Sequence, residues 1–206
     1  MAKTSDLHSP GPSVSPEPVL SGSNGQTDLS RFDNSWYNPG PRWKILLWFV
    51  VNPLFLNTYL PIPIVLKVRL LRLFGAKIGK GVIVKPAVNI KYPWLLHVGN
   101  HVWIGEQVWV DNLSQVVIGD HVCLSQGSML LTGNHDYRQP AFDLTTRPIT
   151  LDNGVWIGAK AVVCAGVHCC SHAVLAVNSV ATQSLNAYGI YQGNPAILVR
   201  QREIFT

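Results

Sequence analysis

The chain has 206 residues, a length typical of one domain, and its 47% apolar and 13% charged composition can supply a substantial core. The net charge is +5, but the basic residues are scattered and show no aromatic–basic stacking motif, which excludes a nucleic-acid-binding protein. The four cysteines are expected to be reduced core residues of a cytoplasmic protein, forming neither a disulfide framework nor a metal site.

Residues 1–30 are rich in Ser, Pro, Gly and Asn and contain few large apolar side chains. Such a composition cannot bury enough apolar surface to offset the entropy lost on ordering, so we expect a disordered tail. The tail has no basic start followed by an apolar core, and we therefore expect no secretory signal.

Residues 31–76 form an apolar and basic segment for which we predict helices. Pro41 can occupy the first turn of a helix running from Trp43 to about Asn52. A second helix is expected from Ile64 to Phe74, where Gly75 provides a stop. The sequence between them is interrupted by Pro53, Pro61 and Pro63.

The predicted helices are expected to cover the open end of the repeats that follow, because the terminal units of a repeat fold need a cap. Contact of residues 41–75 with the inner face of a membrane is expected as an added role, since the segment is basic, apolar and Trp-rich. The prolines, with Asn52 and Asn57, exclude the uninterrupted run of about 20 apolar residues that a spanning helix requires.

From residue 77 to 186 the sequence repeats with a period of six. An aliphatic or small apolar residue recurs at Ile78, Val84, Ile90, Val98, Ile104, Val110, Ile118, Leu124, Leu130, Leu151, Ile157, Val163, Cys169, Leu175 and Ala181. Neither a helix of 3.6 residues per turn nor an alternating strand has this period, whereas a short strand followed by a corner does. We therefore predict an all-β solenoid of hexapeptide repeats.

One polar insertion interrupts the repeats. The spacing from Leu130 to Leu151 is 21 residues, so we expect residues 132–150 to be extruded as a loop, and such loops commonly form a binding face. His135 lies at the base of this loop beside Asn134, and histidine is well suited to accept a proton near neutral pH. The structural alternative is a loop histidine that only hydrogen-bonds its own turn.

Several stretches resemble the hexapeptide-repeat acyltransferases: LTGNHDY at 131–137, GVWIGAKAVVCAGV at 154–167, SVAT at 179–182 and GNPA at 193–196. Others are similar to the colanic acid biosynthesis acetyltransferases of bacterial exopolysaccharide assembly: RFDNSWYNPG at 31–40, LLRLFGAKIGKGV at 70–82 and NIKYPW at 89–94. The resemblance implies a left-handed parallel β-helix, a C-terminal crossover segment at 187–206 and a homotrimer. It also implies transfer of an acetyl group from acetyl-CoA to a hydroxyl of a sugar.

The resemblance further implies roles for particular residues. His135 would be the general base that takes the proton of the acceptor hydroxyl as this oxygen attacks the thioester, without an acyl-enzyme. Acceptor binding is expected at Asp111, Asn112 and Asn134. Cofactor binding is expected at Ala159, Val177, Thr182, Gln183, Gly193, Asn194, Pro195 and Arg200. Gln183 stands where relatives often carry Lys, which removes one charge that would face a phosphate.

Other functions stay as alternatives. Serine O-acetyltransferase, or another small-molecule acetyltransferase, needs the same chemistry on a different hydroxyl. A non-catalytic trimeric assembly module would use the repeats alone, because a solenoid does not by itself imply activity. A γ-type carbonic anhydrase, and with it a metal, is disfavoured, because its zinc site needs two histidines five apart and the close pairs here are four apart.

Overall fold

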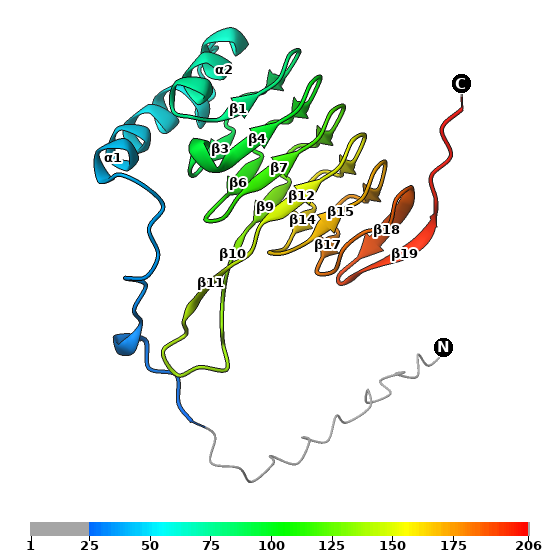
Figure 1. Ribbon diagram of the computed structural model, residues 1–206. Coiled ribbons are helices and arrows are strands. Elements are labelled where there is room, and N and C mark those ends of the chain that lie inside the picture. The colour runs from blue at the N-terminus through cyan, green and yellow to red at the C-terminus, as the bar shows by residue number, and fades with distance from the viewer. Residues whose placement is uncertain (1–24, 206) are drawn as a thin grey trace, which may run out of the picture.

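The computed structural model describes residues 25–205 of the chain, so most of the expected tail, residues 1–24, lies outside the described residues. From Lys77 onward the chain winds as a parallel β-solenoid, and each coil gives one short strand to each of three sheets (Figure 1). Sheet A contains β1 (Lys77–Ile78), β4 (Leu96–Val98), β7 (Val116–Ile118), β12 (Ile149–Leu151) and β15 (His168–Cys169).

Sheets B and C complete the coils. Sheet B contains β2 (Ile83–Val84), β5 (Trp103–Ile104), β8 (Cys123–Leu124), β13 (Trp156–Ile157), β16 (Val174–Leu175), β18 (Gly189–Gly193) and β19 (Ala196–Gln201). Sheet C contains β3 (Asn89–Ile90), β6 (Trp109–Asp111), β9 (Met129–Leu131), β14 (Val162–Val163) and β17 (Val180–Ala181). Within these sheets the pairings are parallel, except that β19 folds back antiparallel on β18 at the C-terminal end.

The predicted repeat positions form the core. All but Ile78 are buried, and Ile78 is partly covered at the end of the solenoid. The parallel register places equivalent residues above one another, as Ile104 on Leu124 and Leu124 on Ile157. Fully burying each such side chain contributes about 1.5–3 kcal/mol, which explains why the six-residue period is kept so strictly.

Coil corners bring backbone from successive coils very close together. A Cβ atom on Gly158, at the corner between sheets B and C, would lie 2.6 Å from the backbone nitrogen of Val177 in the next coil. No real Cβ approaches a backbone atom so closely, so the small residue that follows the aliphatic one is a steric requirement of the corner.

The helical cap consists of α1 (Arg42–Val51), the π-helical turn η2 (Asn52–Leu56) and α2 (Ile64–Leu73). It covers the first coil (Figure 1): Leu56 and Leu71 are fully buried, and the indole Nε1–H of Trp48 donates to the Ile90 carbonyl at 2.8 Å. The ammonium group of Lys67 donates to the Lys85 carbonyl at 3.0 Å, and burial lowers the pKa of this lysine.

Pro53 does not end the helical run, contrary to the sequence-based expectation. The chain continues as η2, with the Asn57 amide donating to the Asn52 carbonyl at 2.8 Å. Pro53 occupies the first turn of η2, where its missing N–H is not needed. The two α-helices otherwise begin and end within about one residue of their predicted limits.

The insertion between β9 and β12 protrudes from the corner between sheets C and A (Figure 1). Its base is an antiparallel ribbon of β10 (Gly133–His135) and β11 (Leu144–Thr146), in which His135 pairs with Leu144. The sequence predicted the extrusion but not this ribbon. Backbone pairing gives the base of the loop a fixed geometry, and His135 belongs to it.

Residues 25–40, which we call the N-terminal arm, run from α1 alongside the loop (Figure 1). Asp28, inside the segment expected to be disordered, caps the 3-10 turn η1 (Leu29–Arg31), and its amide donates to the Pro140 carbonyl at 2.8 Å. The Tyr37 hydroxyl donates to the Leu113 carbonyl at 2.7 Å. A second segment also anchors the arm, since η3 (Pro93–Leu95) contains Trp94, whose indole N–H donates to the Pro39 carbonyl.

Docking of the cap depends on Trp48, which is 3% exposed, and not on Trp43 in the same helix, which is 67% exposed. We expect Trp48→Ala to lower the free energy of unfolding by about 3–5 kcal/mol, because it leaves a large cavity and removes a hydrogen bond. Trp43→Ala should change it by less than about 0.5 kcal/mol. Urea titrations of both variants test this, and equal losses would contradict the docking described.

Attachment of the arm depends on Tyr37. Tyr37→Phe leaves the Leu113 carbonyl without its partner, at a cost of about 1–2 kcal/mol, so opening of the arm should become about 5- to 30-fold more frequent. Trypsin cleavage after Arg31 should accelerate accordingly. Tyr137→Phe, on the protruding loop and 76% exposed, is the control and should leave the cleavage rate unchanged. Identical rates for the two variants would show that this bond does not hold the arm.

Candidate active site

A cavity of about 600 Å³ lies between the arm, the base of the loop and two neighbouring corners of the solenoid. Its lining consists of Phe32, Asn34, Tyr37, Pro39, Lys91, Tyr92, Asp111, Leu113, Gly133, Asn134, His135 and Leu144. Three residues predicted from the sequence, Asp111, Asn134 and His135, therefore meet in one cavity although they come from different coils.

His135 is held in a defined orientation inside this cavity. Its Nδ1 lies 2.8 Å from the Phe142 carbonyl oxygen, and because a carbonyl only accepts, Nδ1 must carry the hydrogen. In the neutral imidazole Nε2 then keeps its lone pair and can accept a proton. The bond within the loop, which was the structural alternative for this residue, is thus present but occupies only one of the two ring nitrogens.

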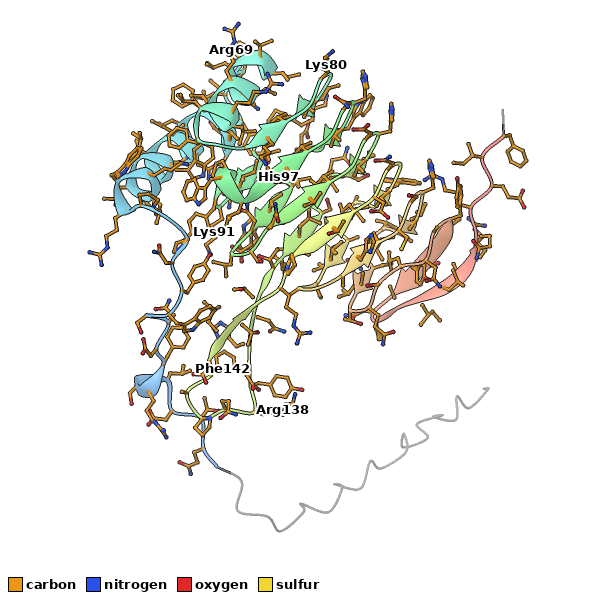
Figure 2. The ribbon with its side chains drawn as sticks, in the orientation of Figure 1. Arg69, Lys80, Lys91, His97, Arg138 and Phe142 are labelled. Carbon is orange, nitrogen blue, oxygen red and sulfur yellow. The ribbon has the colours of Figure 1, made fainter. Side chains whose placement is uncertain are left out.

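Phe142 supports His135 in two ways. Its ring stacks on the imidazole with centroids 4.4 Å apart, while the Phe32 ring of the arm lies 5.8 Å away. Phe142 also has a φ of +56°, which is rare for a bulky residue and marks a conformation that its surroundings impose. Figure 2 shows Phe142 in the loop, on the side that the arm covers.

Two of the residues predicted to bind the acceptor, Asp111 and Asn112, differ in whether they reach the cavity. The Asp111 carboxylate lies 2.9 Å from the Lys91 ammonium group at the cavity wall. Asn112, by contrast, is fully buried, and its amide bonds both the backbone nitrogen and the carbonyl of Tyr92, at 2.9 and 2.6 Å. We therefore correct the expectation for Asn112: with its polar atoms committed to the corner, it cannot reach a ligand in the cavity.

The sequence did not predict that the arm and the corner after β3 would line this cavity. Phe32, Asn34 and Tyr37 come from the stretch 31–40, and Lys91 and Tyr92 from 89–94. Both stretches are similar to colanic acid biosynthesis acetyltransferases, and that similarity was the signal that could have pointed to these lining residues. Burial, with Tyr92 and Asp111 nearby, raises the pKa of Tyr37 well above its usual value, so its hydroxyl stays a neutral donor.

A second cavity of about 580 Å³ lies along sheet B and its corner with sheet C. It is lined by Ser125, Gln126, Trp156, Gly158, Ala159, Val174, Leu175, Ala176, Val177, Ile190, Arg200 and Arg202. Ala159, Val177 and Arg200 of the predicted cofactor-binding set come together here. Trp156 forms part of the wall, and its indole N–H donates to the Ser125 hydroxyl at 2.9 Å.

The two arginines of this cavity differ in their freedom to bind a ligand. Arg202 donates to the carbonyls of Gly154 and His172, at 2.9 and 3.2 Å, and so ties β19 to the coils. Arg200 is exposed, and no hydrogen bond to its guanidinium is found within the described part of the chain. Arg200 is therefore the arginine available for an anionic group.

The remaining cofactor-binding predictions lie elsewhere. Thr182 and Gln183 are exposed at the corner that follows β17. Gly193, Asn194 and Pro195 form the turn between β18 and β19, where the Gly193 amide donates to the Ser179 hydroxyl at 3.0 Å. Neither group lines the Arg200 cavity or the His135 cavity, so a single chain does not unite the predicted set.

Among residues 25–205, one trio of potential metal ligands comes close together: Asp152, His168 and Cys170, on the outside of sheet A. The imidazole Nε2 of His168 lies 2.9 Å from the Asp152 carboxylate, so these two groups already satisfy each other. We assign no metal to this cluster.

Two known acetyltransferases are similar to this chain in sequence. WcaF of Escherichia coli K12, whose assigned role is that of a colanic acid biosynthesis acetyltransferase, is 35% identical over 176 residues, which cover 85% of this chain and 97% of WcaF. The galactoside O-acetyltransferase of the same organism is 27% identical over 130 residues, which cover 61% of this chain and 64% of that enzyme.

A hexapeptide-repeat acetyltransferase from Vibrio cholerae, solved with acetyl coenzyme A, has a TM-score of 0.65 and 27% identity over 72% of this chain and 81% of its own. No family model matches the sequence. The near full-length similarity to WcaF nevertheless agrees with the fold that the chain shares with this solved acetyltransferase. The chain belongs to the hexapeptide-repeat acetyltransferases, within the family of the colanic acid biosynthesis acetyltransferases.

Proposed function

We propose that this protein O-acetylates a sugar of a bacterial exopolysaccharide precursor, with acetyl-CoA as donor and His135 as general base. The observation that carries the proposal is the free Nε2 of His135, which the Phe142 carbonyl leaves available inside a cavity lined with polar groups. Relatives that share the fold support it, since one acetylates galactosides and another was solved with acetyl coenzyme A.

The role of His135 follows from this hydrogen bond. A hydroxyl is a weak nucleophile until a base takes its proton, and Nε2 can do so as the oxygen attacks the thioester carbonyl. The positive charge that develops on the ring is stabilised by the Nδ1–H bond to the Phe142 carbonyl. The proton then passes from Nε2 to the sulfur of the departing thiolate, which restores the neutral imidazole.

The His135 cavity favours a sugar over serine as acceptor. About 600 Å³ is the size of a pocket for a drug-sized ligand and is large for one amino acid. Asn34, Asn134 and the paired Asp111 and Lys91 offer both hydrogen-bond donors and acceptors, as the several hydroxyls of a sugar require. Phe32 and Tyr92 add the flat apolar faces on which a sugar ring can pack.

Acetyl-CoA is proposed to bind in the Arg200 cavity. Ala159 and Val177 leave room for the extended pantetheine arm along the corner, and Arg200 supplies a charge for a phosphate. This cavity has no lining residue in common with the His135 cavity. We therefore propose a homotrimer in which the Arg200 cavity of one subunit faces the His135 cavity of the next, with Thr182, Gln183 and the Gly193–Pro195 turn between them.

Loss of the base should abolish most of the activity. We expect His135→Ala to lower kcat for acceptor-dependent release of coenzyme A by about 10²–10⁴-fold. The assay uses acetyl-CoA with a panel of sugars, nucleotide sugars and serine, so it also identifies the acceptor class. The control is His121→Ala, at a corner outside both cavities, which should retain the wild-type rate. Full activity of His135→Ala would refute the assigned base, and turnover with serine alone would refute the sugar acceptor.

Arg200 can be tested separately from the chemistry. A charge-assisted hydrogen bond contributes about 1.5–3 kcal/mol, so Arg200→Ala should raise KM for acetyl-CoA by about tenfold or more and change kcat little. The control is Arg138→Ala, on the tip of the protruding loop (Figure 2). An unchanged KM for Arg200→Ala would remove this residue from the proposed donor site.

A further inference from the structure

The outer surface of the cap points to a partner that the acetyl-transfer chemistry does not require. We propose that the cap docks on an anionic lipid membrane through the exposed side of α1, η2 and α2, hereafter the cap face. Its large apolar side chains are Trp43, Leu46, Leu47, Phe49, Val50, Leu54, Ile64, Val65 and Leu73. This inference does not depend on the proposed catalytic roles.

The apolar character of the cap face is too extensive for a surface that stays in water. In α1 only Trp48 is buried, while Leu46 and Phe49 are 68% and 78% exposed. In α2 Leu73 is 78% exposed as well. Large exposed apolar patches mark interaction sites, and nine large apolar side chains are exposed on this one cap.

The charge of this end of the molecule indicates what the partner is. Between Asp33 and Glu106 the sequence holds nine Lys and Arg residues and no Asp or Glu. The other 134 residues hold seven basic and eleven acidic residues, which is the remainder of the totals of 16 and 11. The positive charge is thus concentrated on the cap and the first coils, and an acidic lipid surface is complementary to it.

The exposed cations lie around the apolar side chains. Arg42 begins α1, and Arg69 projects from α2 at the end of the molecule furthest from β18 and β19 (Figures 1 and 2). Among the described residues no helix is both long and apolar enough to cross a bilayer. Short helices with aromatic and aliphatic side chains and flanking cations are suited to lie in the headgroup region, with apolar groups inserted and cations at the surface.

Docking through the cap face brings the proposed active site close to the lipid. A cavity of about 420 Å³ beside α1 is lined by Ile45 and Phe49 of the cap and by Trp109 of sheet C. Lys91, Tyr92 and Asp111 line both this cavity and the His135 cavity. A continuous row of residues therefore connects the membrane-facing helix to the acceptor site.

The test is cosedimentation of the full-length protein with vesicles of phosphatidylcholine mixed with phosphatidylglycerol. Wild type should bind these vesicles, bind pure phosphatidylcholine at least about tenfold more weakly, and be released by salt. The double variant Trp43→Ser/Phe49→Ser should lose at least about tenfold in binding, because its substitutions remove the two exposed aromatic side chains of the cap face. Arg42→Gln/Arg69→Gln should weaken binding to the anionic vesicles only.

Matched controls separate the cap face from general stickiness. Trp103→Ser/Phe205→Ser removes one Trp and one Phe of similar exposure, 57% and 86%, away from the cap and should leave binding unchanged. Thermal denaturation checks that each variant is folded. The proposal is overturned if wild type fails to bind anionic vesicles. It is also overturned if Trp103→Ser/Phe205→Ser loses as much binding as Trp43→Ser/Phe49→Ser. It is also overturned if Trp43→Ser/Phe49→Ser lowers the molecular mass in sedimentation velocity, since a second copy of the chain would then cover the cap face.

Discussion

Aliphatic side chains stacked in register along the solenoid axis are the constraint on which the rest of the molecule depends. Val84, Ile104, Leu124, Ile157 and Leu175 lie one above another in sheet B, and each is buried by its neighbours. A shift of one residue would turn a whole strand's apolar side outward, so no coil can lengthen or shorten inside the stack. Extra sequence can leave only at corners, and the residues of the proposed active site lie there.

The loop that carries His135 combines the rigid solenoid with an irregular segment that leaves it. The ribbon of β10 and β11 fixes His135 relative to the corner, and Phe142 returns from the loop in a left-handed conformation to bond it. The arm then closes the cavity by its contacts at Asp28 and Tyr37. Backbone strain at Phe142 is offset by the hydrogen bond from its amide to the Gln139 carbonyl and by the stacking of its ring on the imidazole.

The sequence predicted the features that follow from local periodicity and failed where distant segments meet. The six-residue spacing located the core and the extruded loop, because both depend on residues close in sequence. It did not predict that Phe32 and Tyr37 would line the cavity, since the arm is held by contacts with residues 55 or more positions away in the sequence. The prediction that Asn112 binds the acceptor failed for a related reason. A polar side chain at a corner can hydrogen-bond a ligand or the backbone, and only its contact with Tyr92 shows which of the two occurs.

The same rigidity explains why two cavities must be shared between subunits if the protein transfers acetyl groups as proposed. The His135 loop leaves the corner between sheets C and A, whereas the Arg200 cavity lies along sheet B and its corner with sheet C. Packing of the aliphatic stack fixes the angle between these sides, so no motion within one solenoid brings Arg200 to His135. In the proposed trimer, a neighbouring copy beside sheet C would supply the second cavity, and assembly would then be a condition of catalysis as well as of stability.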